Sequence, residues 1–189
     1  MNIRSERVPL VGKWINLIYM VATGSWKTRL CLAPIAGTLY LSLIVLLVML
    51  SFMTDKSLHF PEAVFYPWSQ FFGIWLIILG MFLMLLSISY FVRIKGTPVP
   101  FCPPPKLVTT GPYRFVRNPM LSGLFIQLFG LGISLGSISL VFIFTPLFIF
   151  INVWELKNVE EPELVKRLGQ DYVEYKKQVP MFFPFCIRK

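Results

Sequence analysis

Residues 111–120 read Gly-Pro-Tyr-Arg-Phe-Val-Arg-Asn-Pro-Met and join a basic segment to a long apolar one. No residue from Asn118 to Trp154 is charged, which makes a run of 37 residues. One helix needs only about 20 residues to cross a bilayer, so this run predicts a hairpin of two helices. Such a hairpin returns Glu155 and the acidic residues after it to the membrane face at which Arg117 lies.

The composition is that of an integral membrane protein. Of the 189 residues, 56% are apolar and 14% are charged, whereas soluble domains have about 25% charged residues. Two further uncharged runs, 30–54 and 63–92, are each long enough to cross the hydrocarbon core. The sequence therefore predicts one all-α membrane domain over residues 1–189, with about four spans. We place these spans near residues 31–53, 68–92, 119–136 and 138–155.

The segment before the first span differs from the spans. It is apolar from Val8 to Trp26 but contains Lys13, and Lys27 and Arg29 follow it. This pattern is typical of a helix that lies in the membrane interface. A fifth span in this segment is the alternative.

The cations are distributed asymmetrically along the chain. Of 18 Lys and Arg residues, 17 fall before span one, between spans two and three, or after span four. The positive-inside rule then places both termini and the Arg117 loop in the cytoplasm. This topology, with attraction to anionic lipid headgroups, explains the net charge of +9. We expect membrane lipids as partners and no nucleic acid.

Metal and histidine chemistry are not supported by the residue types present. Cys31, Cys102 and Cys186 lack the paired spacing of zinc or redox sites. His59 is the single histidine, and it falls on the predicted outer loop. We therefore expect no metal, and no Ser-His-Asp or His-ligated zinc catalysis on the cytoplasmic face.

Two signals precede the predicted hairpin. Five prolines in residues 98–105 predict an extended strap, which is either a rigid connector or the wall of a ligand site. Asn118-Pro119 reads as an N-cap with its side chain accepting a backbone N–H, followed by the first helical residue. The amino end of that helix favours an anionic group.

The hairpin contains many small residues and one proline. Gly132-x-x-x-Gly136 is a small-xxx-small pattern, which predicts close helix packing. A turn near Gly136-Ser137 divides the run into halves that each cross the membrane. Pro146 predicts a kink in the second half.

The residues after Trp154 predict a cytoplasmic amphipathic helix that is broken or restarted at Pro162. Glu160 and Glu161 come close to the membrane, where an unpaired carboxylate is costly and needs a cationic partner. An Arg, a capped helix start and paired carboxylates together suit a zwitterionic ligand. S-Adenosylmethionine is such a ligand, and its methyl group leaves without metal chemistry.

The fragments around these charges occur in an order that resembles a known family. They are Gly111 to Met120, Glu160-Glu161-Pro162, Leu168-Gly169, Asp171-Tyr172, Tyr175 and Val179-Pro180. Together they resemble the isoprenylcysteine carboxyl methyltransferase and phospholipid methyltransferase group, in its bacterial-type form. The likeness covers residues 95–184, about half of the chain.

The resemblance implies an S-adenosylmethionine-dependent membrane methyltransferase with a lipid-like methyl acceptor. Residues 1–92 are then N-terminal helices, and 93–189 form the cofactor-binding catalytic core. The residues implied to frame the cofactor are Tyr113, Arg117, Asn118, Pro119, Met120, Glu160, Glu161, Tyr172 and Tyr175. Of these, Arg117, Asn118 and Glu161 are the implied catalytic residues.

Two positions depart from the family pattern. Eukaryotic prenylcysteine enzymes have histidine where this chain has Asn118, and relatives commonly have tyrosine where it has Leu121. Without an imidazole base, an acceptor that is already ionised, such as a carboxylate, is favoured over an ammonium that must lose a proton. We therefore expect O- or S-methylation of a lipid-like acceptor.

Two alternatives stand beside this interpretation. A phosphatidylethanolamine-type N-methyltransferase would use the same cofactor site, with a neighbouring Glu or the lipid phosphate accepting the proton. A noncatalytic membrane scaffold or transporter subunit would use the charges only for pairing. Transport is disfavoured because no predicted span carries an internal charge.

Overall fold

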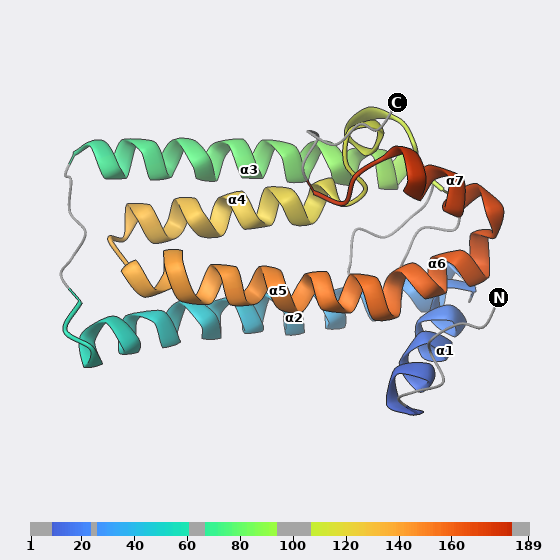
Figure 1. Ribbon diagram of the computed structural model, residues 1–189, viewed down its shortest axis with the longest axis horizontal. Coiled ribbons are helices and arrows are strands. Elements are labelled where there is room, and N and C mark those ends of the chain that lie inside the picture. Colours follow the sequence, from blue (N-terminus) through green and yellow to red (C-terminus); the bar gives the residue numbers. More distant parts are fainter. Residues whose placement is uncertain (1–8, 24–25, 61–66, 94–106, 183–189) are drawn as a thin grey trace. The chain divides into compact units, whose positions relative to one another are not determined.

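The computed structural model describes residues 9–23, 26–60, 67–93 and 107–182 (Figure 1). All regular elements in these ranges are helices, which confirms the all-α prediction. The predicted proline strap at 98–105 lies outside the described residues. By their contacts the described residues form two compact units: one draws its residues from Met1–Thr38, Ser89–Arg117 and Asn152–Lys189, and the other from Leu39–Ile88 and Asn118–Ile151.

Within the part of the chain that the structure describes, three helical stretches are long and apolar enough to cross a membrane, namely Gly37–Ser57, Trp68–Tyr90 and Leu140–Leu168. They belong to α2 (Trp26–Ser57), α3 (Trp68–Arg93) and the helix that contains α5 (Thr145–Glu155). The fourth predicted span is α4 (Pro119–Ser134), which has 16 residues. It rises about 24 Å, less than the ~30 Å hydrocarbon core, because the turn begins at Leu135.

In the second unit, α3 and α4 run side by side with their backbones in contact (Figure 1). A Cβ added to Gly123 would lie 2.6 Å from the carbonyl oxygen of Gly80, and one added to Gly130 would lie 2.7 Å from that of Gly73. Close packing through small residues is therefore confirmed. Within the Gly132-x-x-x-Gly136 pattern, Gly132 packs closely, since a Cβ there would lie 2.7 Å from a side-chain carbon of Val141. Gly136, with φ +66, lies in the hairpin turn.

The hairpin turn is tied to the end of α2. Asp55 accepts a hydrogen bond from the backbone N–H of Ser139 at 2.9 Å and another from the Ser137 hydroxyl. The Ser139 hydroxyl donates to the carbonyl oxygen of Ser51 at 2.8 Å. The hairpin predicted from the uncharged run is thus present, with its turn beside Gly136.

The C-terminal helix contains two π-helical segments, η3 (Leu140–Phe144) and η4 (Leu156–Glu160). Each precedes an X-Pro pair: Thr145 N–H bonds to the Leu140 carbonyl, and Glu161 N–H bonds to the Leu156 carbonyl. Widening by one residue lets the helix continue through each proline, which has no N–H to donate. Of the two alternatives predicted at Pro162, a break is wrong, because the helix is continuous; regular α-helix restarts there as α6, with Pro162 in its first turn.

The helix ends about two turns after Pro162. The α6 segment (Glu161–Leu168) stops at Gly169, which has φ +63, and α7 (Gln170–Gln178) begins there. A positive φ is readily available to glycine and strained for other residues. Gly169 therefore sets the direction of α7, which carries three of the site's side chains.

In the first unit, α1 (Pro9–Thr23) packs against η4 and α6. Ile15 and Ile18 are buried with Val159, while Trp14 and its neighbours on the other face are exposed. Lys166 of α6 donates to the Asn16 side chain at 3.0 Å. The described part of α1 has 15 residues, fewer than the about 20 that cross a bilayer. It is amphipathic, as expected for an interfacial helix.

Candidate functional site

The segment that opens the sequence motif is held by tight packing. Gly111 has φ +62, and a Cβ added there would lie 2.6 Å from ring carbons of Tyr90. The 3₁₀ turn η2 (Gly111–Arg114) follows and buries Pro112 and Tyr113. Arg117 follows this turn, and its backbone N–H donates to the Pro180 carbonyl at 2.8 Å.

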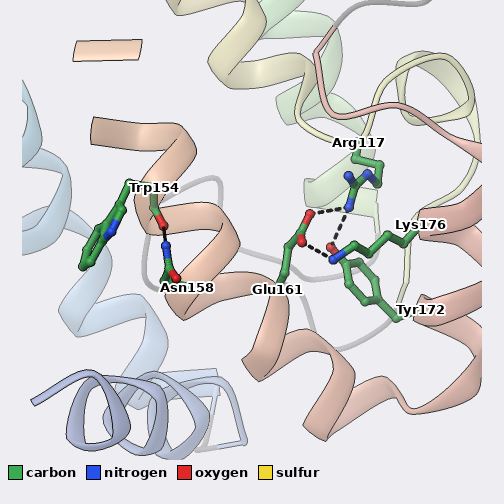
Figure 2. Close-up of polar contacts among 6 residues, drawn as sticks. All are labelled: Arg117, Trp154, Asn158, Glu161, Tyr172 and Lys176. Carbon is green, nitrogen blue, oxygen red and sulfur yellow. Dashed lines mark hydrogen bonds and ion pairs between the residues drawn. The ribbon is translucent and has the colours of Figure 1, made fainter. Parts of the chain in front are cut away.

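The central contact is an ion pair between Arg117 Nη1 and Glu161 Oε1 (Figure 2). The two side chains are only 9% and 5% exposed. Burial of this kind costs several kcal/mol for each ion, which the pair must offset by mutual attraction. The predicted convergence of the motif arginine with the acids beyond the hairpin is confirmed.

Two side chains of α7 complete the network. Lys176 Nζ pairs with Glu161 Oε2, so both oxygens of this carboxylate have a cationic partner (Figure 2). Arg117 Nη1 also donates to Tyr172 Oη at 3.4 Å. Lys176 was not among the predicted site residues. The available signal was its position four residues after Tyr172, which places both on one helix face.

Two further tyrosines stand behind this network. Tyr175 Oη donates to the backbone carbonyl of Tyr113 at 2.6 Å, and its ring lies 6.3 Å from that of Tyr172. Burial raises the pKa of the hydroxyls of Tyr113, Tyr172 and Tyr175. The charge of Glu161 raises the pKa of Tyr172 further. These hydroxyls are therefore neutral hydrogen-bonding groups and not bases.

The acidic residues on the C-terminal helix have different environments. Glu163 is fully buried and pairs with Arg167, whose Nε lies 2.7 Å from Glu163 Oε1. Glu160 makes no hydrogen bond or ion pair within the described residues, and it is Glu161 that faces Arg117. The predicted Glu pair is thus split, with one member in the network.

The remaining predicted residues begin α4, in the other unit. Asn118 occupies the N-cap position, and Pro119 is the first helical residue, as predicted. The predicted side-chain cap is wrong: with φ −126 and ψ 61, Asn118 makes no side-chain cap bond. Its carbonyl instead accepts from the N–H and the hydroxyl of Ser122, each at 3.0 Å. Met120 follows in the first turn of α4.

An open cavity of about 870 Å³ adjoins the tyrosines through Tyr175. One face of α7 forms one side, and residues on either side of η2 form the other. Its lining residues are Leu107, Thr109, Arg114, Phe115, Asp171, Glu174, Tyr175, Gln178 and Val179. The cavity size is within the usual range for small-molecule sites.

The fold and this network define a class: an all-helical integral membrane protein with a buried arginine–carboxylate pair in its C-terminal half. The sequence model of the family described as phospholipid methyltransferase matches residues 68–171. The chain belongs to this family. The match includes the motif at 111–120 and both members of the Arg117–Glu161 pair.

Curated relatives agree with this membership. The chain is 30% identical over 144 residues to protein-S-isoprenylcysteine O-methyltransferase B of Arabidopsis thaliana, which covers 67% of this chain and 68% of the relative. It is 37% identical over 82 residues to protein-S-isoprenylcysteine O-methyltransferase of Schizosaccharomyces pombe, covering 41% of this chain and 33% of the relative.

The name of a third relative specifies a different methyl acceptor. Methanethiol S-methyltransferase 1 of Bradyrhizobium diazoefficiens is 28% identical over 82 residues, which cover 43% of this chain and 27% of the relative. The chain therefore spans about a third or less of these last two relatives. No solved structure gives a significant match. The resemblance drawn from the motifs is confirmed, and the protein is a membrane methyltransferase by family.

Proposed function

We propose that the protein transfers a methyl group from S-adenosylmethionine to a lipid-like acceptor, and that the acceptor atom is a carboxylate oxygen, as in an isoprenylcysteine carboxyl methyltransferase. The observation that carries the proposal is the buried Arg117–Glu161 pair within the segment that the family shares. Bound cofactor would supply an electrophilic methyl group on a sulfonium. The chain's own residues would bind it and orient it.

The residues of the network suit the two charges of an amino-acid-like ligand. Arg117 Nε is buried and has no hydrogen-bond partner within the described residues, so it can donate to a carboxylate. Glu161 offers carboxylate oxygens to an ammonium group. Arg117 also fixes Glu161 through Nη1, which holds the acid in one geometry before any ligand arrives. An arginine and a carboxylate at fixed separation therefore match a zwitterion.

Asn118, Tyr172 and Tyr175 provide no general base, which favours an acceptor that needs none. Asn118 cannot accept a proton, and Tyr172 and Tyr175 stay protonated because their pKa values are raised. A carboxylate acceptor is ionised near neutral pH, so it can attack the methyl group directly. The names of two relatives specify O-methyltransferases and that of a third an S-methyltransferase.

A second candidate is methylation of a phospholipid amine. The description of the matched family as phospholipid methyltransferase favours it. An ammonium acceptor must lose a proton before it can attack. Glu160 is adjacent to Glu161 in the sequence and makes no hydrogen bond or ion pair within the described residues, so it could take this proton.

The proposed topology places the network on the cytoplasmic side, with both termini. The support is the positive-inside distribution, in which 17 of 18 cations share one side. A cofactor that is water-soluble would then enter from the cytoplasm. The lipid-like acceptor would enter from the bilayer.

Transfer of labelled methyl from S-adenosylmethionine tests the proposal. Purified wild type, Glu161→Ala and Glu163→Gln are incubated with total host lipids and with a panel of prenylated thiol acids. We expect base-labile label in a lipid-soluble product with wild type and Glu163→Gln, and none with Glu161→Ala. Glu163→Gln is the matched control because it also breaks a buried ion pair on α6, without touching Arg117.

Each other outcome has a definite meaning. Base-stable label in a phospholipid would select the amine acceptor over the carboxylate. Full activity of Glu161→Ala would remove Glu161 from the site. Lack of both transfer and cofactor binding with wild type would contradict the proposed function.

A further inference from the structure

The two cations on Glu161 are held very differently. Arg117 is 9% exposed, and its backbone N–H and Nη1 bond to Pro180 and Tyr172 as well. The Lys176 side chain is 43% exposed, and within the described residues its hydrogen-bond and ion-pair partner is Glu161 alone. Arg117 is therefore a fixed part of the site, whereas the Lys176 ammonium can leave at little cost.

The group that Lys176 places on Glu161 has the chemistry of the proposed ligand. A lysine side chain ends in a primary ammonium with three donors, and so does the α-amino group of an amino-acid-like cofactor. Oε2 is the oxygen that Arg117 does not contact in this pair, and the Lys176 ammonium lies against it, so a cofactor ammonium that approaches Oε2 would meet that of Lys176. Figure 2 shows Arg117 and Lys176 reaching Glu161 from separate directions. The Lys176 ammonium, which can move away, therefore blocks access to Oε2.

We propose that Lys176 is an internal placeholder, whose ammonium occupies the subsite on Glu161 for the cofactor's ammonium and leaves it when the cofactor binds. This inference rests on the proposed function. It assigns a role in cofactor affinity to a residue that contacts no substrate in the bound state. Arg117 already balances the charge of Glu161, an acid only 5% exposed, so Lys176 is a second cation that can leave without making the buried carboxylate unpaired.

The size of the effect on ligand affinity depends on the fraction of free protein in which the Lys176–Glu161 ion pair is formed. Affinity for a ligand falls by the fraction of protein in the binding-competent state. A half-exposed lysine pair is worth little, so its removal should tighten ligand binding by about two- to five-fold. The effect should be confined to ligands that carry the ammonium group.

The test uses full-length protein in lipid nanodiscs and measures binding of S-adenosylhomocysteine and of 5′-methylthioadenosine, which lacks the amino-acid half. The variants are Lys176→Met and Lys177→Met. Lys177 is exposed on the same helix, so its substitution changes net charge and hydrophobicity equally. We expect Lys176→Met alone to bind S-adenosylhomocysteine about two- to five-fold tighter, with no change for 5′-methylthioadenosine.

A second readout follows Lys176 in the unaltered protein. Acylation of lysines, quantified by mass spectrometry, should increase at Lys176 when S-adenosylhomocysteine is added and stay constant at Lys177. Unchanged or weaker binding by Lys176→Met, or equal acylation with and without ligand, would overturn the placeholder. If wild type binds the ligand in those experiments, the proposed function survives that result. If wild type fails to bind S-adenosylhomocysteine, both proposals fall.

Discussion

The Arg117–Glu161 pair should dominate the stability of the first unit, and the perturbation that isolates it is Arg117→Met. Removing one partner of a buried ion pair leaves an uncompensated charge and costs about 3–5 kcal/mol. Both side chains are less than a tenth exposed, so little of this cost is relieved by solvent. Lys176, at 43% exposure, can replace only part of the lost neutralisation.

The matched comparison is Lys176→Met, which removes the other cation from the same carboxylate. A substantially exposed ion pair contributes about 1 kcal/mol or less because water screens it. For a chain of this length, 1 kcal/mol changes the melting temperature by about 2–4 °C. Arg117→Met should therefore lower it by about 6–20 °C, and Lys176→Met by about 4 °C or less.

The assay is thermal unfolding of the purified protein in one detergent, followed by tryptophan fluorescence at a fixed scan rate. A double-mutant cycle with Glu161→Leu separates the pair from other effects. The doubly substituted protein should be more stable than the sum of the single effects predicts, by about 2 kcal/mol or more. Additive effects, or an equal loss for Lys176→Met, would refute the distinction between a fixed and a movable cation.

Four further predictions concern the surrounding structure. Gly123→Ala should destabilise the protein by about 2–4 kcal/mol, since a Cβ there would lie 2.6 Å from a backbone oxygen of α3. Gly37→Ala, which has open space around it, should stabilise α2 by up to about 1 kcal/mol in the same unfolding assay. Lys166→Ala should cost about 1 kcal/mol or less and increase hydrogen exchange in α1, because the contacts of Lys166 with that helix are lost. Burial raises the pKa of Tyr172 above its ordinary value, so its stabilising contribution is fully present below pH ~10 and is lost as pH rises toward the raised pKa. In alkaline unfolding experiments, Tyr172→Phe should lose stability less steeply than wild type above pH ~10.

Features that depend on local composition were predictable from the sequence. The uncharged run from Asn118 to Trp154 predicted the hairpin, and Pro119 predicted the first residue of α4. The approach of Arg117 to the acids beyond the hairpin followed from the chain's connectivity. These predictions succeeded because burying a charge in hydrocarbon is costly at any position in any fold.

The identity of the acid that meets Arg117 was not predictable from helical periodicity. The π segment at 156–160 inserts one extra residue into the helix and ends at Glu160, the first member of the Glu pair. One residue rotates every later side chain by about 100° around the helix axis. Whether Glu160 or Glu161 faces Arg117 therefore depends on a local widening that the 3.6-residue pattern does not contain.

By itself the sequence determined that this is a helical membrane protein, where its hairpin begins and turns, and that opposite charges meet beyond it. Hydropathy and charge are properties of single residues, so they act wherever the chain goes. Only the tertiary structure decided that Lys176 joins the site and that Gly80 packs against Gly123. The first contact depends on the direction that Gly169 gives to α7, and the second depends on which faces of α3 and α4 meet. Neither is specified by the sequence of a single segment.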